Sequence, residues 1–159
     1  PEVSKITMEI ANRAINGRLI LNDSHIPLLG WCLGHQALGR AVGWDLVESP
    51  LGAIHGVPSK IYHDAEEIFS GIDNPMIQMR YNSLVLKPSN SKLQPTAWDK
   101  TKTLVMGLRH DSLPIHGVQF HPESVGSPDG AKIISSFIDL EPIHTILSEQ
   151  VRQSRRPQS

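Results

Sequence analysis

The residues best suited to chemistry surround the only cysteine, Cys32, which lies in the segment GWCLGHQ spanning residues 30–36. One glycine precedes it by two positions and another follows it by two, after an apolar run over residues 26–29 and before helical spacing over residues 35–42. A strand, a sharp turn and a helix form a nucleophile elbow, where crowding favours glycine at both flanking positions. The start of a helix also favours thiolate over thiol. The segment therefore predicts a nucleophilic cysteine, although a lone cysteine is often only a small buried apolar residue.

A second candidate group is the segment GVQFHPES, residues 117–124, which contains His121 and Glu123. In an extended chain these two side chains point to the same side, and Pro122 stiffens the link between them. A carboxylate in that position can orient the imidazole, fix its tautomer and stabilise the imidazolium. The imidazole could then take a proton from a thiol and later give one to a leaving amine. Taken alone, the pair could also be two ordinary polar residues at a strand end.

Metal chemistry is not expected from this chain. A zinc deaminase also uses a His-x-Glu pair, but it needs two further cysteine ligands, and the chain has one cysteine in total. The remaining histidines show no ligand spacing, and we expect them to be surface or hydrogen-bonded core residues: His25, His55, His63, His110, His116 and His144. We therefore expect no metal and no cofactor.

The composition restricts the class of protein. A length of 159 residues with 39% hydrophobic residues fits one domain with an ordinary core, and a net charge of −1 gives no sign of nucleic-acid binding. One cysteine excludes an intrachain disulfide framework and fits a reducing, cytoplasmic compartment. No apolar run reaches membrane-spanning length, and no signal-peptide pattern opens the chain. We therefore expect a cytoplasmic protein without membrane or nucleic-acid partners.

The elements that must position these groups alternate between helix and strand. Periodicity predicts helices over residues 4–15, 35–42 and 129–140 and a helical turn over 64–69. Strands are predicted over 26–29, 45–48, 51–63 with bends, 76–86 with a break at Asn82-Ser83, 93–98, 104–109 and 115–120. The core face of the last helix is expected to hold Ala131, Ile134, Phe137 and Ile138. The basic, polar tail from residue 142 is expected to be a solvated linker.

Three segments together resemble one enzyme family. Residues 30–36, Arg80–Leu84 (RYNSL) and 117–124 resemble the class I, or triad, glutamine amidotransferases in order and spacing, over about residues 26–140. Within that family the chain is most similar to the glutaminase component of anthranilate and aminodeoxychorismate synthases. The resemblance implies Cys32 as the nucleophile, His121 as general base and acid, and Glu123 as the residue that orients His121.

The same resemblance implies the rest of the site. Gln36 and the segment Ser83-Leu84 would hold the glutamine substrate, and the backbone amide of Leu33 would be one donor of the oxyanion hole. Two positions depart from the family pattern: Trp31 stands where a small or branched apolar residue is usual, and Asn82 stands where histidine is usual.

The implied fold is α/β, a flavodoxin-like class I glutamine amidotransferase fold with a parallel or mixed sheet flanked by helices. We expect residues 1–141 to form the amidotransferase domain. Family members begin with further βα units that end in a glycine-rich loop, the source of a second oxyanion donor, and that loop would precede Pro1. The chain is therefore expected to be truncated on its N-terminal side, with an open sheet edge, and to be weakly active or inactive alone.

The implied function is a glutaminase that supplies ammonia to a chorismate-using synthase, on a separate chain or fused downstream. Enzymes that make GMP, CTP or carbamoyl phosphate share the elbow, but the stretch from Gly107 to Ser124 fits the chorismate branch better. The segments Arg80–Leu84 and Met106–His110 favour aminodeoxychorismate, and hence p-aminobenzoate and folate, over anthranilate and tryptophan. The alternative from another class is a non-catalytic remnant that only docks the synthase.

Overall fold

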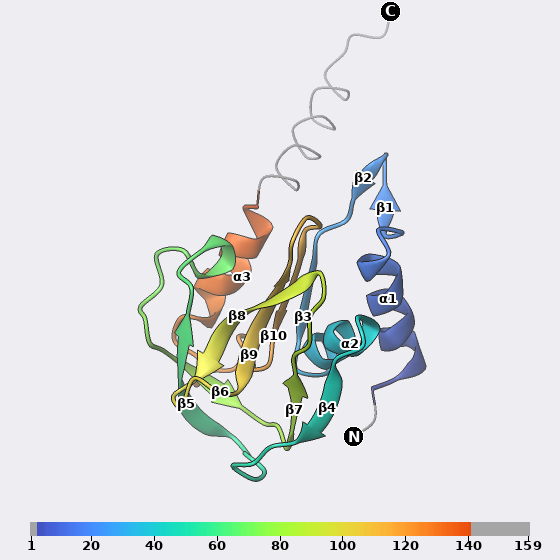
Figure 1. The fold of residues 1–159 in the computed structure, drawn as a ribbon. Coiled ribbons are helices and arrows are strands. Elements are labelled where there is room, and N and C mark those ends of the chain that lie inside the picture. The colour runs from blue at the N-terminus through green and yellow to red at the C-terminus, as the bar shows by residue number, and fades with distance from the viewer. Residues whose placement is uncertain (1–2, 141–159) are drawn as a thin grey trace, which may run out of the picture.

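The computed structural model describes residues 3–140 and consists of one six-stranded sheet, two small two-stranded sheets and flanking helices (Figure 1). The helices are α1 (Lys5–Ile15), α2 (Leu33–Ala41), α3 (Gly130–Ile138) and the 3-10 helix η1 (Glu67–Phe69). The strands are β1 (Ile20–Leu21), β2 (Ser24–His25), β3 (Leu28–Trp31), β4 (Asp45–Glu48), β5 (Val57–His63), β6 (Met76–Arg80), β7 (Leu84–Lys87), β8 (Leu93–Asp99), β9 (Val105–His110) and β10 (Ile115–Val118).

The large sheet is mixed, with the strand order β3-β10-β9-β8-β5-β6. In the described part of the chain β3 and β10 pair in parallel, whereas the other four pairings in this sheet are antiparallel. The expectation of an α/β fold with helices around a mixed sheet is confirmed, but a mainly parallel sheet is not what forms. β3 lies at the edge of the described sheet and pairs only with β10, and the half-exposed Trp31 ends it.

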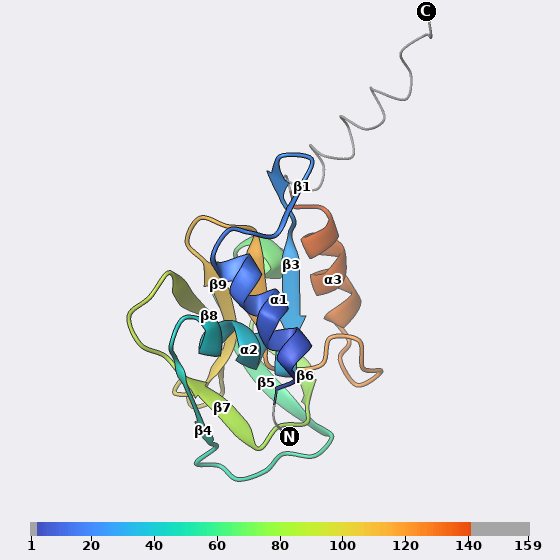
Figure 2. The same cartoon turned by 90° about the vertical axis from the view of Figure 1, so that its right-hand side faces the viewer.

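Helices cover both faces of the sheet (Figure 2). On one face α1 and α2 bury Ala11, Ala14, Ala37 and Leu38 in a core shared with Leu108 and other sheet residues. On the other face α3 and η1 bury Ile133, Ile68 and Phe69 against Met106, Val118 and Phe120. Burial of such apolar side chains stabilises the fold by about 1.5–3 kcal/mol each. The strands that carry the candidate catalytic groups are therefore held from both sides.

The first helix begins where its sequence predicts. The Ser4 hydroxyl accepts a hydrogen bond from the Thr7 amide at 3.2 Å and so satisfies one free N–H of the first turn of α1. Gly17, with φ 66°, follows the Asn16 C-cap and supplies the left-handed conformation that ends many helices. Local capping therefore fixes both ends of α1.

The last helix packs through a face that only partly matches the predicted one. Ile133 is fully buried, Ile134 and Phe137 are partly buried, and Ala131 and Ile138 are exposed. The reason is the start of the helix, because a Cβ at Gly130 would collide with the carbonyl group of Pro122. Gly130 thus packs on the turn after His121, and Ile133, which the prediction left out, faces the core, so the predicted face is partly wrong.

The strand predictions hold with two adjustments. In the stretch 51–63 only Val57–His63 forms a strand, and residues 51–56 form a loop that contains Gly52 and Gly56 at positive φ. The predicted break at Asn82-Ser83 is present because β6 pairs in the large sheet, whereas β7 pairs with β4 in a separate two-stranded sheet. The chain changes sheets at the segment that the family resemblance assigns to the substrate.

Candidate active site

Cys32 lies at the junction of β3 and α2, in a strained conformation with φ 51° and ψ −106°. Its amide donates a hydrogen bond to the Val118 carbonyl at 2.9 Å, which ties the turn to the end of β10. A Cβ at Gly30 would lie 2.7 Å from the carbonyl carbon of Gly34, so the turn tolerates only glycine at position 30. A Cβ at Gly34 would meet nothing within 4 Å. Crowding therefore explains one of the two flanking glycines, and the expectation for the other is wrong.

The two glycines give a matched test of the elbow. Gly30→Ala should lower the free energy of unfolding by about 1–3 kcal/mol, because the turn must open to accept the methyl group. Gly34→Ala, in the first turn of α2, should be neutral or stabilise by up to about 1 kcal/mol. Urea denaturation of both variants measures the difference. Equal stabilities would show that the turn is not crowded at Gly30.

The surroundings of Cys32 raise the pKa of its thiol. Burial raises the pKa of Cys32, the Leu33 amide lowers it in part, and the nearby charge of Glu123 raises it again. His35 supplies no compensating positive charge, because complete burial lowers its pKa to about 3. The expectation that the helix start favours the thiolate is therefore wrong, since desolvation outweighs the backbone N–H. A nucleophile in this position needs a base to remove its proton.

His121 and Glu123 follow β10 and form a close pair. The His121 Nδ1 and Glu123 Oε1 atoms are 2.6 Å apart. Because a carboxylate can only accept, Nδ1 carries the proton and Nε2 keeps its lone pair. The Nε2 atom is buried and has no hydrogen-bond partner among the described residues. Since β3 and β10 are parallel neighbours, this base and the thiol both lie beyond the carboxyl ends of adjacent strands.

Backbone contacts fix the position of the base. The His121 amide donates to the Met79 carbonyl at 2.9 Å, and the Ser127 hydroxyl donates to the His121 carbonyl at 2.8 Å. The Tyr81 ring meets the imidazole edge-on with 5.0 Å between the ring centroids. Sequence reasoning did not assign Tyr81 to the site, because an aromatic residue after a strand gives no signal of which side chain it will contact.

The structure brings Gln36 and Leu84, both assigned to the substrate, into contact. Gln36 is 3% exposed, and its Nε2 donates to the Leu84 carbonyl at 3.3 Å. Asn82 donates to the same carbonyl at 3.0 Å and accepts from Arg80 Nε at 3.2 Å. Ser83 is exposed, and its carbonyl accepts from the Ser49 amide at 2.8 Å. The departure at Asn82 is therefore a structural contact of the substrate segment.

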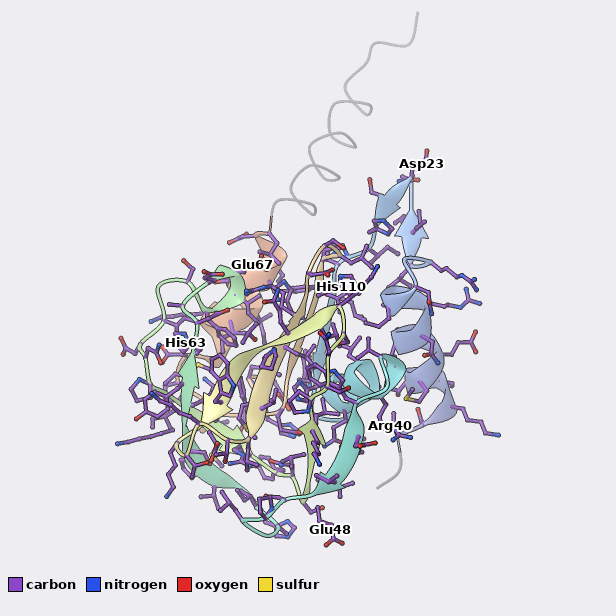
Figure 3. The ribbon with its side chains drawn as sticks, viewed as in Figure 1. Asp23, Arg40, Glu48, His63, Glu67 and His110 are labelled. Atoms are coloured by element: carbon purple, nitrogen blue, oxygen red, sulfur yellow. The ribbon has the colours of Figure 1, made fainter. Side chains whose placement is uncertain are left out.

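A second group of titratable side chains lies at the other end of the sheet, where Figure 3 labels Glu67 and His110. His116 Nε2 is 3.1 Å from Glu67 Oε2, and Arg109 pairs with Asp64 at 3.1 Å. Burial and the charge of Arg109 lower the pKa of His116 to about 4. This group holds η1 against the sheet and does not approach Cys32.

The histidines without an assigned role divide into two kinds. Two are exposed (His25, His55), four are buried (His35, His63, His110, His116), and His144 lies outside the described residues. Within residues 3–140 no group of histidine, cysteine or carboxylate side chains could hold a metal ion. In the same range no helix is long and apolar enough to cross a membrane.

The sequence matches a known protein family and proteins of two bacteria. The family model described as glutamine amidotransferase class-I matches residues 4–140. The aminodeoxychorismate/anthranilate synthase component 2 of Bacillus subtilis is 42% identical over 115 residues, which cover 72% of this chain and 59% of that protein. The aminodeoxychorismate synthase component 2 of Escherichia coli is 38% identical over 140 residues, which cover 87% of this chain and 70% of that protein.

A solved structure supports the fold. The crystal structure of a glutamine amidotransferase from Thermotoga maritima superposes with a TM-score of 0.62 at 17% identity, over 96% of this chain and 57% of that one. At this identity the likeness concerns the fold alone. The chain spans 59% of the length of its Bacillus relative, so the activity of a whole protein does not follow from the match.

Proposed function

The chain belongs to the class I glutamine amidotransferase family, and we propose that it hydrolyses the side-chain amide of glutamine and supplies the ammonia to a chorismate-using synthase. The observation that carries the proposal is the strained Cys32 turn beside the His121–Glu123 pair, at the ends of the only two parallel strands of the described sheet. A nucleophile, a base and a carboxylate that orients the base form the arrangement needed for acyl transfer.

We assign one step of the reaction to each group. The lone pair on His121 Nε2 takes the thiol proton as Cys32 Sγ attacks the amide carbon of glutamine. Glu123 holds the proton on Nδ1 and stabilises the imidazolium. The imidazolium returns its proton to the leaving nitrogen, and ammonia departs. Water, deprotonated by the same imidazole, then hydrolyses the thioester to glutamate and frees the thiol.

The tetrahedral intermediates carry a negative charge on oxygen. Leu33 follows the nucleophile as the first residue of α2, where backbone N–H groups have no partner within the helix. Its amide is the donor that we assign to this oxyanion. One such donor typically contributes about a hundredfold to a thousandfold in rate.

We assign the synthase to the aminodeoxychorismate branch, with a separate or fused partner chain and a cytoplasmic, reducing setting. The support is the resemblance of Arg80–Leu84 and Met106–His110 to that branch. Relatives carry both names, since the Methanocaldococcus jannaschii protein named anthranilate synthase component 2 is 42% identical over 130 residues. The glutaminase site binds glutamine in either case, so the partner determines the product.

Complementation with the full-length gene tests this assignment. In low-ammonium medium the gene should rescue growth of a p-aminobenzoate auxotroph that lacks its glutaminase component, and a tryptophan auxotroph should stay unrescued. High ammonium is the control, because it makes the glutaminase unnecessary. Rescue of the tryptophan auxotroph alone would assign the anthranilate branch, and rescue of neither would count against the glutaminase.

A further inference from the structure

Gln119 is a fully buried polar side chain that the mechanism above does not use. It follows β10, its backbone amide donates to the Met106 carbonyl at 2.8 Å, and its side chain is 0% exposed. Its Oε1 accepts a hydrogen bond from Gln36 Nε2 at 3.2 Å. Burial of an amide is costly unless it is hydrogen-bonded, and Gln119 Nε2 has no partner among the described residues. The burial of this side chain therefore needs an explanation.

One carbonyl group determines how both amides are oriented. The backbone oxygen of Leu84 can only accept, so the Gln36 atom beside it must be the NH2 group. The atom of Gln119 that faces this NH2 group must then be its oxygen. The two protons of Gln36 Nε2 are thereby used by two acceptors, on β7 and after β10.

This double contact leaves the oxygen of Gln36 available. No described residue donates a hydrogen bond to Gln36 Oε1, and this atom is not fully enclosed. Gln36 lies one helical turn after Cys32, so its free oxygen can face the same pocket. An acceptor there suits an N–H group, such as the α-ammonium group of an amino acid.

We propose that Gln119 is a positioning residue of the glutamine site. It holds the amide of Gln36 in the one orientation that presents Oε1, and not the NH2 group, to the substrate. The inference rests on the proposed function, because it assumes that Gln36 contacts glutamine. If Gln119 were absent, the Gln36 amide could rotate, and glutamine would bind more weakly while the thiol kept its reactivity.

The test is labelling of Cys32 in the full chain, which needs no turnover. The probe is 6-diazo-5-oxo-L-norleucine, a glutamine analogue whose diazoketone loses dinitrogen as the thioether forms. Gln119→Met replaces the amide oxygen by a thioether, which is at most a weak acceptor, at similar volume. It should raise the half-saturating probe concentration about tenfold, with a limiting rate within about threefold. Iodoacetamide, which has no α-ammonium group, should label the wild type and this variant at equal rates.

Three further variants make the result specific. Gln78→Met is the matched control, because Gln78 is also 0% exposed but makes no side-chain hydrogen bond, and it should leave the half-saturating concentration unchanged. Gln119→Ala should behave as Gln119→Met, and Gln119→Glu, which keeps an acceptor, should bind the probe as the wild type does.

The possible outcomes distinguish failure of the Gln119 inference from failure of the proposed glutaminase function. An unchanged half-saturating concentration in Gln119→Met or Gln119→Ala would overturn the inference, as would a tenfold rise in Gln119→Glu. The Gln119→Glu variant can therefore still overturn the inference if neither Gln119→Met nor Gln119→Ala folds. Absence of saturable labelling in the wild type would instead count against the glutaminase itself.

Discussion

Cys32→Ser should abolish glutamine-dependent synthesis by the complex with the synthase and leave ammonium-dependent synthesis unchanged. The hydroxyl of serine is a much weaker acid than the thiol, so His121 cannot activate it to the same degree. Removal of the nucleophile of a triad costs about a millionfold in kcat in the best-studied case. The measurement is product formation with glutamine and, separately, with ammonium as the nitrogen source.

The ammonium reaction is the internal control for folding and docking. Because Cys32 is the only thiol in the chain, the same variant must also lose all labelling by iodoacetamide. Glutamine hydrolysis that survives in Cys32→Ser would disprove its role as the nucleophile.

His121→Ala should lower glutamine hydrolysis by about a hundredfold to ten-thousandfold, because general acid and base catalysis contributes that much. The half-buried thiol, with its raised pKa, then has no group to accept its proton. Glu123→Gln should cost less than His121→Ala, since the orientation of the imidazole and the stabilisation of the imidazolium are weakened but the base itself remains. The measurement is kcat for glutamine in each variant.

A histidine at the other end of β3 provides the matched control. His25 is exposed, lies in β2 before the start of β3 and has no assigned role, whereas Cys32 follows the end of β3, so His25→Ala should retain wild-type kcat. If His121→Ala and Glu123→Gln also retained it, the pair would be two ordinary polar residues at a strand end.

Local elements could be predicted because their signals are local. The Ser4 cap, the Gly17 stop and the apolar spacing between them determine α1 within its own sequence. The packed face of α3 could not be predicted in this way, because it depends on the contact between Gly130 and Pro122, which the turn after His121 creates. Periodicity locates a helix, but its rotation about its axis depends on what it meets.

The pairing of the strands could not be predicted from local signals. Alternation identifies β8 and β9 as strands but carries no direction, so the mainly antiparallel sheet became visible only in the structure. The candidate catalytic residues were assigned from the motifs around Cys32 and His121 and from the family resemblance, and not from periodicity. The sign of the Cys32 pKa shift required the depth of burial, which no spacing in the chain reveals.

The buried amide of Gln119 was missed for a related reason. Its position directly before Phe120 and His121 suggests a polar residue at a strand end, and nothing nearby in sequence can bond to it. Its partner, Gln36, is 83 positions away in the chain. Such pairs can be recognised only after the fold has joined their strands.

That separation also has a consequence for biosynthesis. A ribosome adds about 5–20 residues per second, so the 83 positions between Gln36 and Gln119 correspond to roughly 4–17 seconds of translation. During this interval the nascent chain carries the thiol without its base or the clamp on Gln36. The parallel pairing of β3 with β10, which brings the two halves together, is a late, long-range contact. The proposed glutaminase site is therefore incomplete on the nascent chain until β10 has paired with β3.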